Sequence, residues 1–367
     1  MASSVSSSVP SSVPSGTSSG IPATPPPSDG PRKTSDGRLQ SLAALIDETE
    51  DKLRRGLTAG AQVWPTRFPA LDRALAGGVR SGELLLLGGP QGQGKTTMAM
   101  QFLRNAVAVG HAAVIFSYEH EAHTLLERLL ALEAAEAKGI EAARVQDVRK
   151  AFEEAGAHGA SLGSRLGPLE GGSEALSALT AYGNRLHVHE STGTSTDLGE
   201  VRRVVEEVRE STGRPPMVLV DYLQKVPTPG GPVNEDERAT MVVEQLKDLA
   251  LDLEVPVIAI VAAEKASLVA GHRMRIHDLR GSSSLAYEAD IVLIINDKYD
   301  IVAKQHLVYD LGNVDRFRHW VVLSLEKNRN GVDRVDLEFR KMFEHGRFDP
   351  HGQIVNEQLI EERVFVT

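Results

Sequence analysis

The chain has 367 residues, 41% of them hydrophobic, with no cysteine and a formal net charge of −10. Without cysteine there can be no disulfide, thiolate nucleophile or cysteine-based zinc site, and we expect a cytoplasmic protein. The acidic balance excludes a uniformly basic nucleic-acid binder but allows a local basic surface. No apolar run approaches the ~20 residues of a membrane span, so we expect no membrane partner.

The chain begins with a low-complexity segment. Residues 1–36 are mostly Ser, Pro, Gly and Thr, which bury too little apolar surface to offset the entropy of ordering, so we predict a disordered arm. Residues 37–62 are predicted to hold an amphipathic helix and a flexible linker, Gly56–Gln62. Apolar residues recur in that helix at helical spacing: Leu39, Leu42, Leu45, Ile46 and Leu53. Such a helix needs a surface to pack on, either its own domain or a neighbouring subunit.

Apolar strands alternate with helical segments over 63–350, followed by a C-terminal tail over 351–367. This alternation predicts an α/β domain, a mostly parallel twisted sheet with helices on both faces. The predicted strands are Leu84–Leu87, Ala113–Ser117, Leu186–His189, Met217–Asp221, Val257–Val261, Ile291–Ile295 and Val321–Leu325. The predicted helices are Thr97–Val109, Ala122–Glu136, Leu198–Thr212 and Ala239–Leu253. Between Glu133 and Gly183 we expect helices joined by a flexible loop around Gly163–Gly172.

A phosphate-binding loop follows the first of these strands. The run Gly89-Pro90-Gln91-Gly92-Gln93-Gly94-Lys95-Thr96 matches the P-loop pattern at every fixed position. Its glycines allow backbone N–H groups to approach phosphate oxygens, and the next helix directs its N-terminal dipole at the same charge. We therefore predict ATP and Mg²⁺ as cofactors, with Lys95 neutralising the outer phosphates and the Thr96 hydroxyl on Mg²⁺. The predicted nucleotide contacts are Gly89, Gln91, Gly92, Gln93, Gly94, Lys95, Thr96 and Thr97.

Two carboxylates complete this prediction. Asp221 ends the apolar run Met217–Val220, where it would lie beside the P-loop and orient Mg²⁺. Glu119 follows the strand Ala113–Ser117, where a carboxylate can reach the γ-phosphate side and activate the attacking water. Histidines pair at His120 and His123 and at His187 and His189, but no third ligand has the spacing of a metal site.

These motifs together resemble the RecA-like P-loop ATPase domain of DnaB-type replicative helicases, over about Leu39 to Pro350. The resemblance rests on ordered blocks of sequence: Phe68–Asp72, Gly77–Leu84, Phe116–His120, Asp221–Gln224, Val255–Ala259, Asp278–Ser282, Ala289–Val292 and Lys327–Gly331. It implies that Glu119 is the catalytic base. It also implies an ATP-hydrolysing ring, a homo-oligomer of the hexameric kind, that acts as a 5′–3′ helicase or translocase on single-stranded DNA.

The same resemblance assigns roles across a subunit interface. Lys327 and Arg329 would reach into the neighbour's site, with Arg329 acting there as an arginine finger. The helix Leu39–Leu53 would dock on the adjacent ATPase domain. A loop facing the central channel would hold the DNA backbone through Arg273, Arg275, Arg280, Gly281, Ser282 and Ser283, which offer charge, hydroxyls and open N–H groups.

The chain departs from the family in three places. We expect no N-terminal collar domain, because the first 36 residues are too short and too polar, so primase recruitment is not implied. Ala262 stands where the family has a glutamine, and an alanine side chain cannot relay a hydrogen bond between γ-phosphate and DNA loop. The family pattern Arg-Glu-Ser-Gly is here Arg280-Gly281-Ser282-Ser283, so the loop loses an acid and its glycine shifts.

Two other functions stay open at this stage. A RecA-like ATPase of the KaiC or RadA kind, which drives a protein assembly or recombination step, would share the Leu71–Gly82 entry and Lys327-Asn328-Arg329. Asp221-Tyr222-Leu223-Gln224 favours the DnaB type instead. An ATP-binding ring scaffold without motor activity is compatible with Ala262 and a missing collar, whereas Lys95, Glu119 and Arg329 argue against it.

Overall fold

The computed structural model describes residues 39–56, 59–154, 159–232, 234–264, 267, 271–308 and 311–361. The arm predicted over 1–36 and part of the linker Gly56–Gln62 lie outside these ranges. The described strands are β1 (Val63–Trp64), β2 (Val79–Arg80), β3 (Leu84–Gly88), β4 (Ala112–Ser117), β5 (Leu186–Glu190), β6 (Pro216–Asp221), β7 (Val257–Ile260), β8 (Ile291–Asp297), β9 (Trp320–Asn328), β10 (Val335–Met342), β11 (Arg347–Phe348) and β12 (Gln353–Ile354).

The α-helices include all four that the sequence predicts within the domain. They are α1 (Leu42–Arg54), α2 (Pro69–Ala74), α3 (Lys95–Ala108), α4 (Ala122–Lys138), α5 (Val145–Glu153), α6 (Leu162–Leu166), α7 (Gly172–Tyr182), α8 (Leu198–Thr212), α9 (Glu235–Asp252), α10 (Ser282–Glu288), α11 (Lys298–Ile301), α12 (Gln305–Val308) and α13 (Leu311–Arg318). No helix in the described ranges combines the length and apolar composition needed to cross a bilayer.

The central sheet has ten strands in the order β11-β10-β9-β8-β3-β7-β6-β4-β5, with β12 paired to β10. The strands from β8 to β5 pair in parallel, whereas β9 and β10 add an antiparallel edge. The predicted α/β class with a mostly parallel sheet is confirmed. The P-loop strand β3 lies between β7 and β8, and all its residues are buried.

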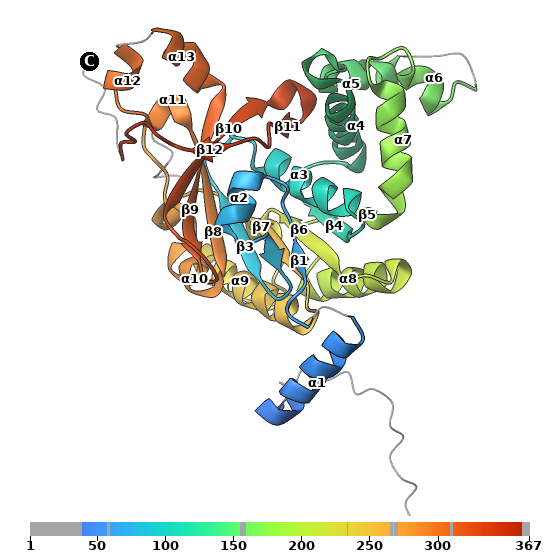
Figure 1. The fold of residues 1–367 in the computed structure, drawn as a ribbon, viewed down its shortest axis with the longest axis vertical. Coiled ribbons are helices and arrows are strands. Elements are labelled where there is room, and N and C mark those ends of the chain that lie inside the picture. Colours follow the sequence, from blue (N-terminus) through green and yellow to red (C-terminus); the bar gives the residue numbers. More distant parts are fainter. Residues whose placement is uncertain are drawn as a thin grey trace, which may run out of the picture.

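Helices cover both faces of the sheet (Figure 1). On one face α2 and α3 enclose an aromatic core, in which Phe68 meets Phe102 and Phe339 edge to face. On the other face α8, α9 and α10 bury Val205, Leu246 and Leu285. A separate small core joins α4, α5, α6 and α7 into a lobe beside the sheet. Both faces are therefore sealed, and the loops at the carboxyl ends of the parallel strands are free to form a site.

The structure differs from the sequence prediction in three local features. The loop expected around Gly163–Gly172 contains α6, which the Ser161 side chain caps by accepting a hydrogen bond from Ser164 N. Strand β10 was not predicted, although Val335, Leu337 and Phe339 alternate with charged residues. The segment expected as a tail packs on the domain, because β12 pairs with β10 and Val302 bridges to Leu359.

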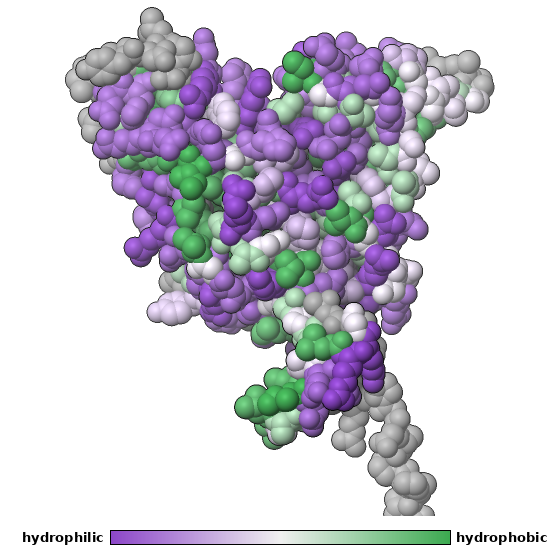
Figure 2. Space-filling model, viewed as in Figure 1, coloured by the Kyte–Doolittle hydropathy of each residue, from purple (hydrophilic) through white to green (hydrophobic). Residues whose placement is uncertain are grey.

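Helix α1 stands apart from this body. None of its residues is buried, and Leu42, Leu45 and Ile46 are 73%, 47% and 56% exposed. Figure 2 shows hydrophobic surface on the helix that projects at the bottom of the view. Within the described residues, α1 therefore buries no apolar face against its own domain.

Candidate nucleotide site

The P-loop is shaped by glycines that no other residue could replace. Gly89 has φ +144°, and a Cβ on it would lie 2.3 Å from the carbonyl oxygen of Ile295. Gly94 has φ +83° and caps α3, and a Cβ there would lie 2.7 Å from the Phe343 ring. Close approach on both sides, with positive φ, explains the glycines at these positions. The loop so formed presents the N-terminus of the 14-residue helix α3 to the carboxyl edge of the sheet.

Lys95 and Thr96 begin α3 and point in different directions. The Lys95 ammonium folds back over the loop and donates to Gly89 O and Pro90 O, both at 2.9 Å. Burial lowers the pKa of Lys95, although the carboxylates of Asp221 and Glu119 oppose that shift. The Thr96 hydroxyl donates to Asp221 Oδ2 at 2.8 Å. The sequence-predicted partners Thr96 at the start of α3 and Asp221 at the end of β6 are thus brought together.

Asp221 is the buried anion of the site. Its side chain is 2% exposed, and its Oδ1 atom has no hydrogen-bond partner among the described residues. Burial, followed by the nearby Glu119 charge, raises the pKa of Asp221 to about 6, while Thr96, Lys95 and Arg128 act in the opposite direction. Mg²⁺ binds oxygen ligands. The unpartnered carboxylate oxygen of Asp221 and the adjacent Thr96 hydroxyl are ligands of this kind.

The site lies in a cavity of about 690 Å³. Most of the predicted nucleotide contacts line it, namely Gly89, Gln91, Gly92, Gly94, Lys95, Thr96, Thr97 and Asp221, together with the predicted base Glu119. Gln93 lies in the same loop but not in this lining, and its Oε1 is buried without a described partner. One ligand atom each of Glu119, His120 and Asp221 lies within 4.8 Å of the others, a grouping that could hold a metal ion and that the spacing of the histidines in sequence did not reveal.

Sequence reasoning missed several residues of this cavity. Arg128 of α4, Arg149 of α5, and Phe343 and Gly346 after β10 also line it. A signal for Arg128 was present, because the pair Glu127-Arg128 interrupts a helix that is otherwise apolar around it. Phe343 had no comparable signal, since only the return of β10 to the P-loop brings it to the cavity.

Lys327 and Arg329 lie far from this cavity. Strand β9 is antiparallel to β8 and ends with Asn328 opposite Ile291, the first residue of β8, whereas the P-loop follows Gly88 near the other end. Lys327 Nζ donates to Ala286 O at 2.7 Å, and Arg329 Nη2 donates to Tyr287 O at 2.6 Å. Both cations thus share the C-terminal end of α10, where a helix favours positive charge. Neither can serve the P-loop of its own chain.

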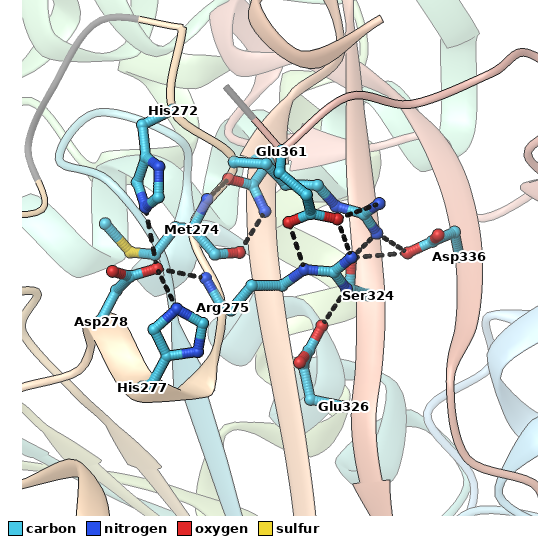
Figure 3. Close-up of polar contacts among 11 residues, drawn as sticks. His272, Met274, Arg275, His277, Asp278, Ser324, Glu326, Asp336 and Glu361 are labelled. Carbon is cyan, nitrogen blue, oxygen red and sulfur yellow. Dashed lines mark hydrogen bonds and ion pairs between the residues drawn. The ribbon is translucent and has the colours of Figure 1, made fainter. Parts of the chain in front are cut away.

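Each arginine predicted to hold DNA is paired with a carboxylate. Figure 3 shows the contacts of Arg275 with Glu326 and Glu361. Arg273 Nη2 lies 2.5 Å from Asp336 Oδ1, and the Arg273 side chain is only 5% exposed. Arg275 pairs with Glu326 at 2.7 Å and with Glu361 at 2.5 Å. The burial of Arg273 contradicts the expectation that it contacts DNA, because its charge is neutralised inside the protein.

Arg280 of the predicted DNA loop lies closer to the surface than Arg273. Arg280 pairs with Glu235 at 2.9 Å, and its side chain is 25% exposed. Gly281 follows with φ +81° and caps α10. Ser282 and Ser283 belong to the first turn of α10, and the side chains of both lie outside the described part of the structure. Ala262 lines the nucleotide cavity, and its N–H donates to Gln224 Oε1 at 3.1 Å.

Replacing Asp221 with Asn is expected to stabilise the chain at pH 7 in the absence of nucleotide and metal. The folded-state pKa lies above the unfolded value of 3.8, so the folded chain binds this proton more tightly and stability falls as pH rises from about 4 to 6. Removing the charge should add up to about 3 kcal/mol to the unfolding free energy at pH 7. Urea unfolding at pH 7 and pH 4 measures this difference, which should vanish at pH 4. A variant that is less stable than the parent chain at pH 7, with a smaller difference at pH 4, would show that Lys95 and Arg128 outweigh the burial cost.

The sequence-family model of the DnaB-like helicase C terminal domain matches residues 64–349 of this chain. The chain is 29% identical over 332 residues to the replicative DNA helicase DnaB of Pasteurella multocida, covering 87% of this chain and 62% of the relative. It is 27% identical over 327 residues to that of Haemophilus influenzae, with the same coverages. The chain thus spans less than two thirds of the length of these relatives.

Solved structures show the same fold. One of them, an ATPase domain, aligns with a TM-score of 0.65 at 17% identity, over 85% of this chain and 99% of that domain. A DnaB-like replicative helicase, solved in a study of its interactions with primase, aligns with a TM-score of 0.65 at 18% identity, over 84% of this chain and 68% of that one. The resemblance inferred from the sequence is confirmed. With a family model matching most of its length, the chain belongs to the DnaB-like helicase C-terminal domain family.

Proposed function

We propose that this chain is a Mg²⁺-dependent ATPase that assembles into a ring, most simply a hexamer, and moves along or unwinds single-stranded DNA in the 5′–3′ direction. The observation that carries the proposal is the convergence of the P-loop, Glu119 and Asp221 on one cavity. Thr96 and Asp221 would hold Mg²⁺, which neutralises phosphate charge when bound. Glu119, exposed at the cavity, would take the proton of the attacking water.

The position of Arg329 supports hydrolysis between subunits. Its side chain is 50% exposed and lies at the sheet end opposite its own P-loop. A guanidinium so placed can reach only a neighbour's phosphates, which is the role of an arginine finger in trans. Lys327 beside it would add a second cation to the same neighbouring site.

The first experiment is ATP hydrolysis by the purified protein with and without single-stranded DNA, at about 50 mM and about 200 mM salt, a range over which phosphate contacts weaken strongly. We expect stimulation by DNA that falls steeply with salt, because phosphate contacts release counterions. Hydrolysis indifferent to DNA would contradict the DNA motor and leave an ATPase. No hydrolysis at all would leave a nucleotide-binding scaffold.

The DNA contact is proposed for the turn at Arg280 and Gly281, with Ser282 and Ser283 following. This turn connects to the cavity, because Arg280 N donates to Ala262 O at 3.2 Å. Arg275, which is 26% exposed, would have to leave Glu326 and Glu361 before it could bind phosphate. This neutralised loop also favours a second candidate, a RecA-like ATPase of the KaiC or RadA kind that drives protein assembly.

Helix α1 is proposed to close the ring by docking on a second copy. Replacing Leu45 and Ile46 together with Glu should convert the ring into smaller species, because it places charge on the apolar face while keeping a good helix former. The thermal midpoint should not change in the dissociated chain, since no α1 residue is buried. Sedimentation velocity measures the assembly, and Asp47→Asn on the same exposed helix is the control. A ring of unchanged size would contradict this docking role.

A further inference from the structure

Arg128 is a cation in the nucleotide cavity that has no acidic ion-pair partner among the described residues. Helix α4 carries it to the cavity wall, opposite the P-loop residues that line the same space. Arg128 forms no ion pair with any residue that the structure describes. Its closest polar contact is His120, whose Nε2 lies 3.5 Å from Arg128 Nη1, at the outer limit of a hydrogen bond.

Neighbouring arginines are satisfied in ways that Arg128 is not. Arg149 lines the same cavity but pairs with Glu127 at 3.0 Å. Arg104, also on the α4 side of the sheet, pairs with Glu133 at 2.6 Å. Arg128 thus differs from both, because it is a partly buried guanidinium without an ion pair to any described residue.

Such an arrangement is unfavourable in the empty protein. Burial lowers the pKa of Arg128, which means that desolvation works against its charge. Asp221 is the strongest electrostatic partner that opposes this shift, and Glu119 also opposes it. The contact with His120 places the guanidinium near these carboxylates, because a ring nitrogen of His120 lies within 4.8 Å of carboxylate oxygens of Glu119 and Asp221. A guanidinium at this end of the cavity can bind a phosphate group there.

The backbone fixes this position as well. Gly346 has φ +63° and packs directly against α4, since a Cβ on it would lie 2.9 Å from Arg128 O. Phe343, one turn earlier, lines the same cavity. The segment after β10 thus holds the α4 backbone at Arg128 close to the P-loop, which is the rigidity that a phosphate-binding group requires.

We propose that Arg128 binds the γ-phosphate of the ATP held by its own chain, and so distinguishes ATP from ADP before any neighbour contributes. The role rests on the proposed ATPase function and deepens it. Arg329 would then act from the neighbour on the phosphate that Arg128 already holds in cis. A planar guanidinium can bind phosphate through two parallel N–H donors, which suits a terminal phosphoryl group.

The first test measures equilibrium binding of a non-hydrolysable ATP analogue and of ADP to Arg128→Gln, in the presence of Mg²⁺. The analogue is expected to lose at least about tenfold in affinity, as for a charge-assisted hydrogen bond, while ADP changes less than about threefold. Arg128→Lys should recover part of the loss, and its melting curve controls for folding. Arg149→Gln is the matched control, because that arginine lines the same cavity but is already paired. Equal losses for both nucleotides, or an equal selective loss in Arg149→Gln, would overturn the proposal.

The second test separates action in cis from action in trans. Chains carrying Arg128→Gln are mixed with chains carrying Lys95→Ala, and hydrolysis is measured after reassembly. If Arg128 acts in cis, each nucleotide site in the mixture lacks either Arg128 or Lys95, because both side chains come from the chain that holds the P-loop. Activity then stays at the level of the separate variants. A mixture of Arg329→Ala with Lys95→Ala chains is the positive control. Where the P-loop of an Arg329→Ala chain faces a Lys95→Ala neighbour, the site contains both Lys95 and Arg329. Recovery with Arg128→Gln would place Arg128 in a neighbour's site and refute the cis role. If wild-type chains do not hydrolyse ATP, the proposed function fails, while the binding experiment still decides the role of Arg128.

Discussion

Replacing Lys95 with alanine is expected to reduce ATP turnover by at least about a hundredfold, into the range seen when one preorganised charge-stabilising donor is removed from a site. In the nucleotide-free chain the ammonium lies over the loop, bonded to Gly89 O and Pro90 O. Those carbonyls hold the cation inside the cavity, ready to turn toward the outer phosphates. Alanine leaves the glycine backbone and the α3 dipole in place, so weak nucleotide binding should survive.

Steady-state hydrolysis and nucleotide titration of Lys95→Ala measure the two effects separately. Lys138→Ala serves as control, because that lysine lies at the far end of α4 and pairs with Glu174 at 3.0 Å on the surface. Turnover close to that of the wild type would overturn the assignment of the whole site, including Glu119 and Asp221.

Replacing Arg329 with alanine is expected to lower turnover by about 10³- to 10⁵-fold, as loss of an arginine finger does, while nucleotide affinity changes little. Affinity is spared because Arg329 lies at the sheet end opposite its own P-loop. The fold should also be spared. Asp290, which lies 3.4 Å from the Arg329 guanidinium, keeps its ion pair with Lys247 at 2.7 Å and its hydrogen bond from Leu84 N at 2.8 Å.

Turnover and nucleotide affinity of Arg329→Ala are measured on the assembled ring, with sedimentation as the check that assembly persists. Arg318→Ala, at another exposed arginine, controls for loss of surface charge. A parallel loss of nucleotide binding would instead assign Arg329 a structural role at the end of α10.

The sheet was predictable because its parallel strands are continuous apolar runs buried on both faces, such as Met217–Val220 and Ile291–Ile295. The P-loop and the acids after two strands were predictable for a related reason. Parallel strands end at one edge of a sheet, so residues that follow them meet there. Strand β10 is not such a continuous apolar run, because charged residues alternate with apolar ones along it, and one of the charged residues, Glu338, is fully buried where it pairs with Lys298.

The part of the site that could not be predicted depends on charges that meet only in the folded chain. Arg273 and Arg275 are surrounded in sequence by His, Met and Ile, and nothing near them indicates a buried cluster. Their partners Asp336 and Glu361 are 63 and 86 positions away. Arg128 presents the reverse case, since the adjacent Glu127 suggests a local partner, whereas Glu127 pairs with Arg149 across two helices.

The central place of β3 has a consequence for how the chain reaches its folded state during synthesis. This strand is flanked by β7 and β8, and the hydrogen bond from Leu84 N to the Asp290 side chain spans 206 positions. A ribosome therefore releases the nucleotide loop long before the strands that hold it exist. Loop closure over such a separation is slow, and the apolar residues of β3 remain uncovered meanwhile. The nascent chain should bind no nucleotide until β8 has emerged, which makes ATP affinity a readout of completed folding.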